Sequence, residues 1–200
     1  MPAQDGIAFL REDHRAVKKL FKEFSATGDR AYAQRRRLAD RIITELSIHA
    51  GIEENVLYPR ARVAVPKSND DVLEALEEHH VVKTILAELE KMQPSDERFA
   101  PKMKVLIENV KHHIDEEESE LFPKLRKAFS REDLIVMGED MRAAKRVMPT
   151  RPHPTAPDEP PGSITAAVVS APVDAARKTV GAAVRRGRKA VAGVVDGSGR

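Results

Sequence analysis

Apolar residues recur every three or four positions through most of residues 1–148, which is the spacing of one face of an α-helix. The pattern predicts helices near residues 5–26, 30–57, 69–92 and 96–129, with a shorter one near 131–147. Turn-forming residues separate them at 27–29, from Pro59 to Asn69, and at 93–95. Ser130 and Asp133 resemble a capping box that starts the fifth helix. Pro123 is expected to kink or restart the fourth helix.

The sequence pattern of one helical hairpin occurs twice in the chain. IHAGIEENVLYP (48–59) and HHIDEEESELFP (112–123) both place a glutamate four residues after a histidine, and both end in an apolar residue, an aromatic residue and proline. EDHRAVKKLF (12–21) likewise resembles EEHHVVKTIL (77–86). Two such hairpins predict an all-α, antiparallel, up-down-up-down four-helix bundle with a short fifth helix.

A histidine interrupts the apolar stripe of each long helix. His14 takes the position between Leu10 and Val17, and His79 the position between Leu76 and Val82. The second and fourth stripes carry a histidine and then a glutamate one turn later, which shares the same helix face. We therefore expect six polar side chains to point into one layer of the core, namely His14, His49, Glu53, His79, His113 and Glu117.

Burying these groups without partners would destabilise the fold by about 1–3 kcal/mol for each polar group, and by more for a charge. Metal cations satisfy them directly, and histidine with carboxylate suits iron, manganese or zinc. Six ligands are too many for one tetrahedral zinc ion and suit two metal ions that share bridging carboxylates. In this interpretation Glu117 is the buried member of its acidic run, and Glu116 and Glu118 lie off the stripe.

The same residues allow other interpretations. A single His-x-x-x-Glu is more often a surface pair than a metal site, and a buried network of histidine and glutamate without metal is the structural alternative. His80 is the alternative ligand to His79, whereas His112 is expected at the surface or behind the ligands, and His153 in solvent. Tyr58 is expected to pack beside Pro59 rather than enter the site.

Composition divides the chain into three parts. We expect a bundle over residues 1–148, a proline-rich linker over 149–163 and a basic, Ala/Val-rich tail over 164–200. Residues 149–200 hold 8 basic and 4 acidic residues, although the net charge of the chain is only +2. The tail is expected to be either a flexible solvated segment or an amphipathic helix that contacts a nucleic acid or an anionic membrane surface. We expect residues 1–148 to hold metal without it.

The chain contains no cysteine, which excludes disulfides, thiolate zinc sites and iron–sulfur clusters. Its first 20 residues lack the apolar run of a signal peptide, and no stretch reaches the ~18 apolar residues of a membrane span. A cytoplasmic protein is therefore expected.

With these residues in place, the chain resembles the hemerythrin/HHE cation-binding family over roughly residues 5–147. The resemblance lies in His14, HAGIE (49–53), His79 and HIDEE (113–117), in that order, together with LFPKL (121–125) and GEDMRAAK (138–145). It implies a non-haem di-iron centre held by the six residues above. It also implies a small ligand such as dioxygen, peroxide or nitric oxide, and a role in the response to oxidative stress, iron or oxygen.

Two departures from the family pattern matter. Oxygen-carrying hemerythrins have the pattern His-x-x-x-His on the third helix, whereas this chain has Lys83 in place of the second histidine. They also have an aspartate five residues after the last histidine, whereas in this chain Glu117 follows His113 by four residues. The missing fifth histidine argues against stable oxygen carriage. A peroxide- or nitric-oxide-reducing enzyme and a non-catalytic iron or oxygen sensor acting through its basic tail both remain consistent with the sequence, as does a bundle without a physiological metal.

Overall fold

The computed structural model describes residues 4–156. Its elements are α1 (Gly6–Ser25), α2 (Tyr32–Ile52), η1 (Glu53–Leu57), α3 (Tyr58–Ala64), η2 (Pro66–Ser68), α4 (Asn69–Lys91), α5 (Phe99–Glu116), η3 (Glu117–Leu121), α6 (Phe122–Ala128) and α7 (Arg131–Ala144). No strand occurs among these residues. The expected tail and residues 157–163 of the expected linker lie outside the described part of the chain.

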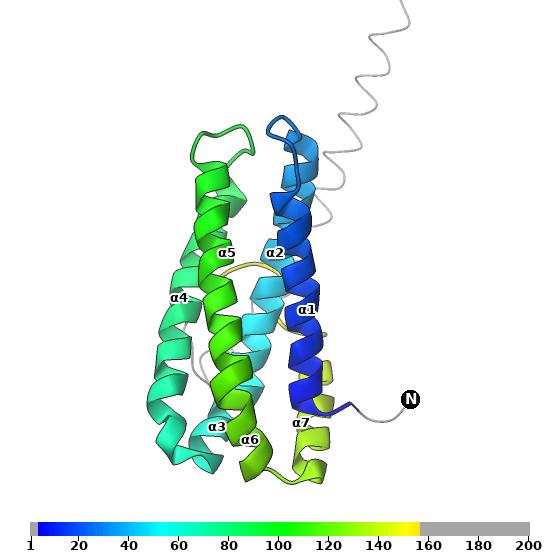
Figure 1. The fold of residues 1–200 in the computed structure, drawn as a ribbon, viewed down its shortest axis with the longest axis vertical. Coiled ribbons are helices and arrows are strands. Elements are labelled where there is room, and N and C mark those ends of the chain that lie inside the picture. The colour runs from blue at the N-terminus through cyan, green and yellow to red at the C-terminus, as the bar shows by residue number, and fades with distance from the viewer. Residues whose placement is uncertain (1–3, 157–200) are drawn as a thin grey trace, which may run out of the picture.

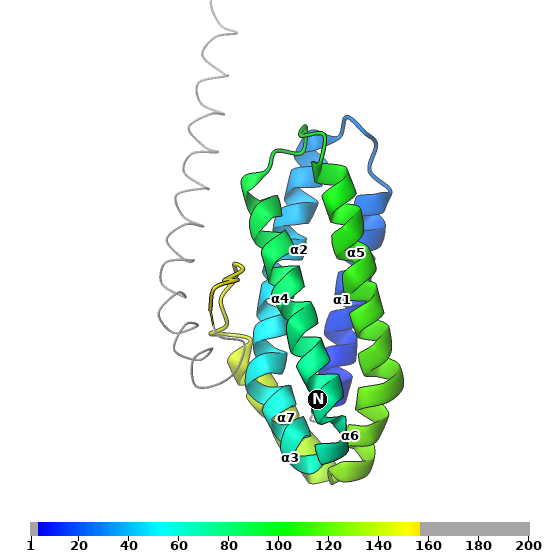
Figure 2. The same cartoon turned by 90° about the vertical axis from the view of Figure 1, so that its left-hand side faces the viewer.

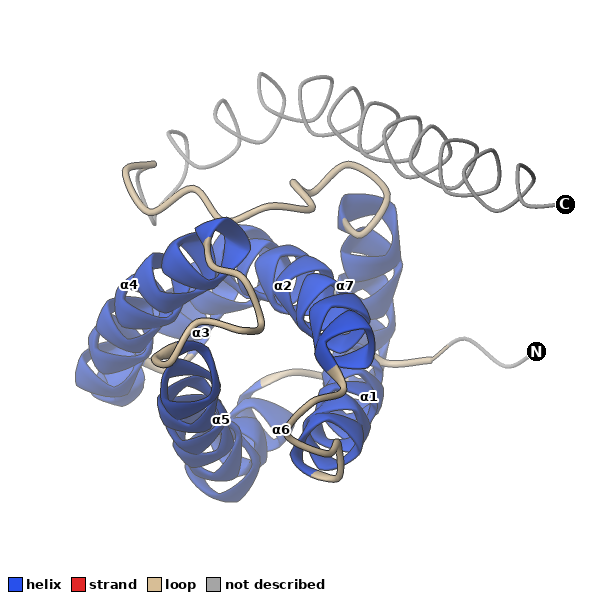
Figure 3. Cartoon of the chain, turned by 90° about the horizontal axis from the view of Figure 1, so that it is seen from above, coloured by secondary structure: helices blue, strands red, loops and turns tan. Residues whose placement is uncertain are grey.

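The four long helices stand side by side (Figures 1 and 2) and surround a common axis when seen from above (Figure 3). The α1–α2 and α4–α5 loops lie at one end, and α3 and α6 lie at the other. Successive helices therefore run in opposite directions, as the repeated hairpin predicts. The expected all-α fold is confirmed.

The fifth helix packs against α1. Its capping box is confirmed, because Ser130 Oγ accepts a hydrogen bond from Asp133 N and the Asp133 carboxylate accepts one from Ser130 N. A Cβ at Gly138 would lie 2.3 Å from the carbonyl oxygen of Gln4. Glycine at this position therefore allows α7 to approach the start of α1 closely.

The expected break at Pro59 is wrong, because helical structure continues to Ala64. Proline lacks an N–H and its ring crowds the carbonyl four residues earlier. Here both prolines follow a π-helical turn, η1 before Pro59 and η3 before Pro123, and each turn ends with a hydrogen bond spanning five residues, from Tyr58 N to Glu53 O and from Phe122 N to Glu117 O. The wider turn carries the helix past the proline, and α6 restarts around Pro123 as expected.

The apolar core is divided into two clusters. One contains Leu10, Leu57 and Phe122, and the other contains Phe21, Ile42 and Met103. The histidines and glutamates that interrupt the stripes lie between the two clusters, so that apolar side chains cover the polar layer at both ends.

Residues that follow α7 still touch the bundle. Met148 packs against Gly51, and Arg151 forms a 3.0 Å ion pair with Glu90 of α4. Among the described residues, no helix combines the length and the apolar character that crossing a bilayer requires.

Candidate metal centre

The structure brings all six predicted site residues together. The histidines come from α1, α2, α4 and α5, and Glu53 and Glu117 are the first residues of the two π-helical turns. None of the six is more than 5 % exposed. His80 and His112, the neighbours of two of these histidines, are exposed, so the rotation expected for both helices agrees with the structure.

Glu53 lies between two pairs of histidines. Its Oε1 is 3.1 Å from His49 Nε2 and 3.8 Å from His14 Nε2. Its Oε2 is 3.3 Å from His79 Nε2 and 3.9 Å from His113 Nε2. Each carboxylate oxygen therefore faces one pair, so that Glu53 offers one oxygen donor to each pair of histidines.

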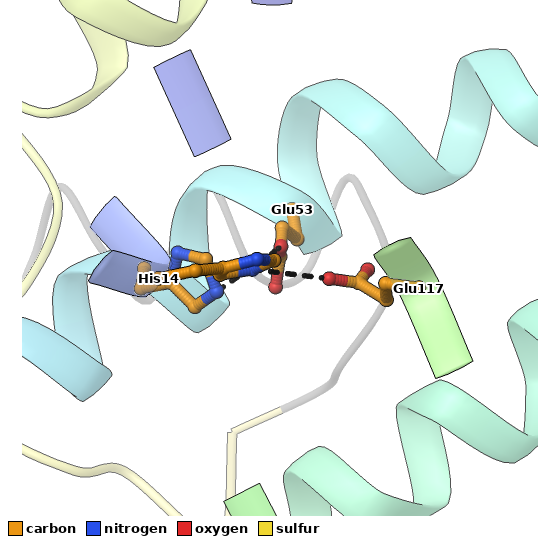
Figure 4. A group of neighbouring side chains, drawn as sticks. His14, Glu53 and Glu117 are labelled. Carbon is orange, nitrogen blue, oxygen red and sulfur yellow. Dashed lines mark ion pairs between the residues drawn. The ribbon is translucent and has the colours of Figure 1, made fainter. Parts of the chain in front are cut away.

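Glu117 approaches the same space from the opposite side of the bundle (Figure 4). Its Oε2 is 3.3 Å from His14 Nε2 and 3.7 Å from His113 Nε2. Its Oε1 accepts a 3.1 Å hydrogen bond from the Tyr58 hydroxyl, which also lies 3.3 Å from His79 Nε2. Tyr58 therefore enters the site, contrary to the sequence-based expectation, because the helix continues through Pro59.

The outer nitrogens of three histidines contact carboxylates. His79 Nδ1 is 2.9 Å from Glu54, His14 Nδ1 is 2.9 Å from Glu118, and His113 Nδ1 is 2.7 Å from Glu78. Such contacts fix the orientation of an imidazole and direct its Nε2 towards a metal. Sequence reasoning missed all three acids, although the doublets Glu53-Glu54 and Glu117-Glu118 recur in register.

The fourth histidine differs from the others. By the repeat, Asp13 corresponds to Glu78, but its carboxylate binds Lys145, the residue that follows α7, at 2.7 Å. His49 Nδ1 has no hydrogen-bond partner among the described residues. The fifth helix therefore breaks the symmetry of the two hairpins at this position.

Lys83, at the position of the missing fifth histidine, supports a ligand indirectly. Its Nζ lies 2.7 Å from the Glu54 carboxylate, which in turn contacts His79. The ammonium thus holds the carboxylate that orients a histidine.

Several atoms that face this space lack hydrogen-bond partners among the described residues. They are His14 Nε2, His49 Nε2, both oxygens of Glu53 and Glu117 Oε2. Buried polar atoms are rarely left in this condition, and these are nitrogen and oxygen donors that transition metals accept. The residues present therefore fit a metal centre.

In the absence of metal, the pKa values of these side chains indicate which of them carry protons. Burial would lower the pKa of His14, but its contacts with the Glu117 and Glu53 carboxylates raise it to about 10. Burial lowers the pKa of His49 to about 3. Burial would raise the pKa of Glu53, but the surrounding histidines hold it well below its usual range. A cation that binds here has to displace the His14 proton, whereas His49 is already neutral.

The donor atoms form two groups that share one residue. One group is His14, His49, Glu53 and Glu117, and the other is Glu53, His79 and His113. Within each group the atoms lie within 4.8 Å of one another.

Comparisons with known proteins agree with this arrangement. The family model of the hemerythrin HHE cation binding domain matches residues 5–125. An uncharacterized hemerythrin-like protein of Schizosaccharomyces pombe is 30% identical over 167 residues, which cover 83% of this chain and 81% of the relative. A DNA nickase of a Nostoc species is 32% identical over 136 residues, which cover 68% of this chain but 38% of that protein.

A solved structure shares the fold. It is that of a hemerythrin HHE cation binding domain-containing protein from Mycobacterium kansasii, with a TM-score of 0.62 and 25% sequence identity. The similarity covers 72% of this chain and 86% of that one.

Proposed function

Because the chain belongs to the hemerythrin HHE cation-binding domain family, we propose that its buried centre holds two iron ions and binds or reduces a small oxygen or nitrogen species. The position of Glu53, with one oxygen towards each pair of histidines, is the observation that carries this proposal. One ion would be held by His14, His49, Glu53 and Glu117, and the other by Glu53, His79 and His113. Manganese and zinc accept the same donors and are the competing metals.

A pair of iron ions supplies reversible electron transfer and coordination positions for dioxygen, peroxide or nitric oxide. The protein supplies the enclosure and the orientation. Glu54, Glu78 and Glu118 hold three of the imidazoles, while the apolar clusters above and below exclude bulk water. Tyr58 places a hydroxyl beside Glu117, where it can donate a hydrogen bond to a ligand carboxylate. We place this chemistry in the response to oxidative stress, iron or oxygen.

Metal content tests the proposal directly. After anaerobic loading with ferrous iron, removal of excess metal and exposure to air, the protein is expected to retain close to two iron ions per chain. Ferric iron bound by histidine and carboxylate should then absorb in the near ultraviolet and visible. Iron is measured by elemental analysis together with the optical spectrum. Retention of one ion only, or of zinc in preference to supplied iron, would refute the di-iron assignment.

Paired histidine variants test which helix face carries the ligands. His79→Ala is expected to lose at least half of the bound iron, because His79 is buried in the centre, whereas the exposed His80→Ala should retain it. His113→Ala and His112→Ala form the second pair, with the loss confined to the former. Iron per chain after desalting is the measurement, and the reverse ranking would contradict the ligand set.

We also propose that the tail, residues 164–200, contacts an anionic partner, since it holds seven basic and two acidic residues. The similarity to a DNA nickase makes DNA one candidate, and an anionic membrane surface is the other. Through such a contact the domain would act as an iron or oxygen sensor, which is the alternative to an enzyme.

Truncation separates this tail from the centre. A chain ending at Ala156 keeps the Arg151–Glu90 ion pair and all six ligand positions. It is expected to retain its iron but to lose salt-sensitive binding to DNA or to anionic vesicles, because screening weakens such contacts. Binding is measured for both lengths at low and high salt. Equal binding by the two lengths would remove the tail from the proposal, and loss of iron would show that the tail supports the bundle.

A further inference from the structure

An acidic cavity leads from the surface to the buried centre. It has a volume of about 60 Å³, which is room for a few water molecules, and two of the candidate ligands, His113 and Glu117, line it. Its other acidic lining residues are Asp71, Glu74, Glu78, Glu116 and Glu120. Lys124 neutralises Asp71 through an ion pair of 2.6 Å, so the cavity keeps an excess of negative charge.

A second group of metal-ligating side chains adjoins this cavity. Glu78 of α4 and His112 and Glu116 of α5 each offer one donor atom, and these atoms lie within 4.8 Å of one another. An imidazole with two carboxylates suits iron, manganese or zinc. The His112–Glu116 contact of 3.1 Å would be an ordinary helix-surface pair if it stood alone. Glu78, which reaches it from a different helix, makes it a three-donor group.

Two observations connect the outer group to the inner one. Glu78 Oε2 accepts a 2.7 Å hydrogen bond from His113 Nδ1, so a single carboxylate belongs to the outer group and contacts an inner ligand. Glu117 is 3 % exposed and lines the cavity, and its Oε2 has no hydrogen-bond partner among the described residues. Donor atoms therefore continue from exposed His112 to the interior.

We propose that Glu78, His112 and Glu116 form a surface site for a divalent transition-metal ion, from which the ion passes through the acidic cavity to the buried centre. The inference rests on the proposed function, because the buried centre has to take up metal. A cleft lined by one sign of charge raises the local concentration of the opposite ion and its association rate by roughly 10–10³-fold. Side-chain oxygens replace the water ligands that the ion loses on its way inward.

The test measures the rate of metal loading in the full-length protein. Metal-free protein is mixed with Co²⁺, and the visible absorption of bound cobalt is followed with time. Glu116→Gln is expected to load about tenfold more slowly and with a weaker dependence on salt, yet to hold the same cobalt content after desalting, which removes exchangeable surface ions. Glu108→Gln, an exposed carboxylate of the same helix outside the cavity, is the matched control and should load like the unmodified protein.

His112→Gln distinguishes a binding site from a purely electrostatic effect, because it removes a nitrogen donor and leaves every carboxylate in place. It should slow loading severalfold, whereas His80→Gln, an exposed histidine of α4, should not. Circular dichroism checks that all four variants fold.

Unchanged rates in Glu116→Gln or in His112→Gln would overturn the proposal, and so would a lowered cobalt content after desalting in either variant. If the unmodified protein takes up no cobalt and no iron, the proposed function fails first. That result differs from normal loading at rates that Glu116→Gln and His112→Gln leave unchanged, which would contradict only the surface site.

Discussion

Replacing Glu53 with glutamine is expected to abolish stable iron binding beside His79 and His113 and to leave no more than one iron ion per chain. Glu53 is the one residue that the two donor groups share, and each of its oxygens faces a different pair of histidines. Glutamine keeps the volume but loses the negative charge and one of the two oxygen donors. The second group would retain only His79 and His113, which is too few protein ligands for a transition metal.

A neighbouring substitution provides the control. Glu54 contacts His79 Nδ1 rather than the shared space, so Glu54→Gln removes an outer support without removing a donor. Loss of such a support typically weakens metal affinity by about 10–100-fold. Glu54→Gln should therefore still reach close to two iron ions per chain at saturating metal, whereas Glu53→Gln should retain no more than one. Two iron ions in Glu53→Gln, measured by elemental analysis after desalting, would show that this carboxylate is not a shared ligand.

Removal of metal is expected to lower the melting temperature by about 15–30 °C. A ligand present at 1,000 times its Kd stabilises the folded state by about 4.1 kcal/mol, so two ions contribute about 8 kcal/mol. In a domain of this size each kcal/mol corresponds to about 2–4 °C. The effect is large because the six side chains interrupt the apolar core between its two clusters and keep unsatisfied donors when metal is absent.

The melting temperature is measured by circular dichroism or calorimetry on iron-loaded and chelator-treated protein. Glu53→Gln is the control, since its melting temperature should respond to added iron by no more than half as much. Equal melting temperatures for the loaded and chelated unmodified protein would indicate that protons and hydrogen bonds alone satisfy the polar layer.

The helices and the six inward-facing residues followed from the sequence because both depend on local periodicity. His79 was distinguished from His80 by its place on the stripe of Leu76 and Val82, and burial in the structure agrees with that choice. A position one residue away on a helix points about 100° away. The apolar stripe of a helix therefore specifies which of two adjacent histidines faces inward.

The carboxylates behind the histidines did not follow from the sequence. Glu118 was correctly placed off the stripe, but its partner is His14, on a helix more than 100 residues earlier in the chain. Such a contact depends on the relative rotation and height of two helices, which periodicity within each helix does not determine. The repeated Glu-Glu doublet was visible, but a doublet does not reveal which helix its second member faces.

Pro59 does not end the helix, and the reason is local. A proline breaks an α-helix when its ring meets the carbonyl of the preceding turn, but the π-helical turn at Glu53–Leu57 widens that turn. The same device precedes Pro123. In both repeats the π-helical turn begins at a candidate ligand, which agrees with the tendency of such turns to occur at functional sites.

The central claim is that two iron ions share Glu53 in one buried layer. Anomalous diffraction from crystals of the iron-loaded protein, recorded on both sides of the iron absorption edge, tests it most directly. Two iron peaks are expected, one among His14, His49, Glu53 and Glu117 and the other among Glu53, His79 and His113. A single peak, or iron peaks located away from Glu53, would contradict it.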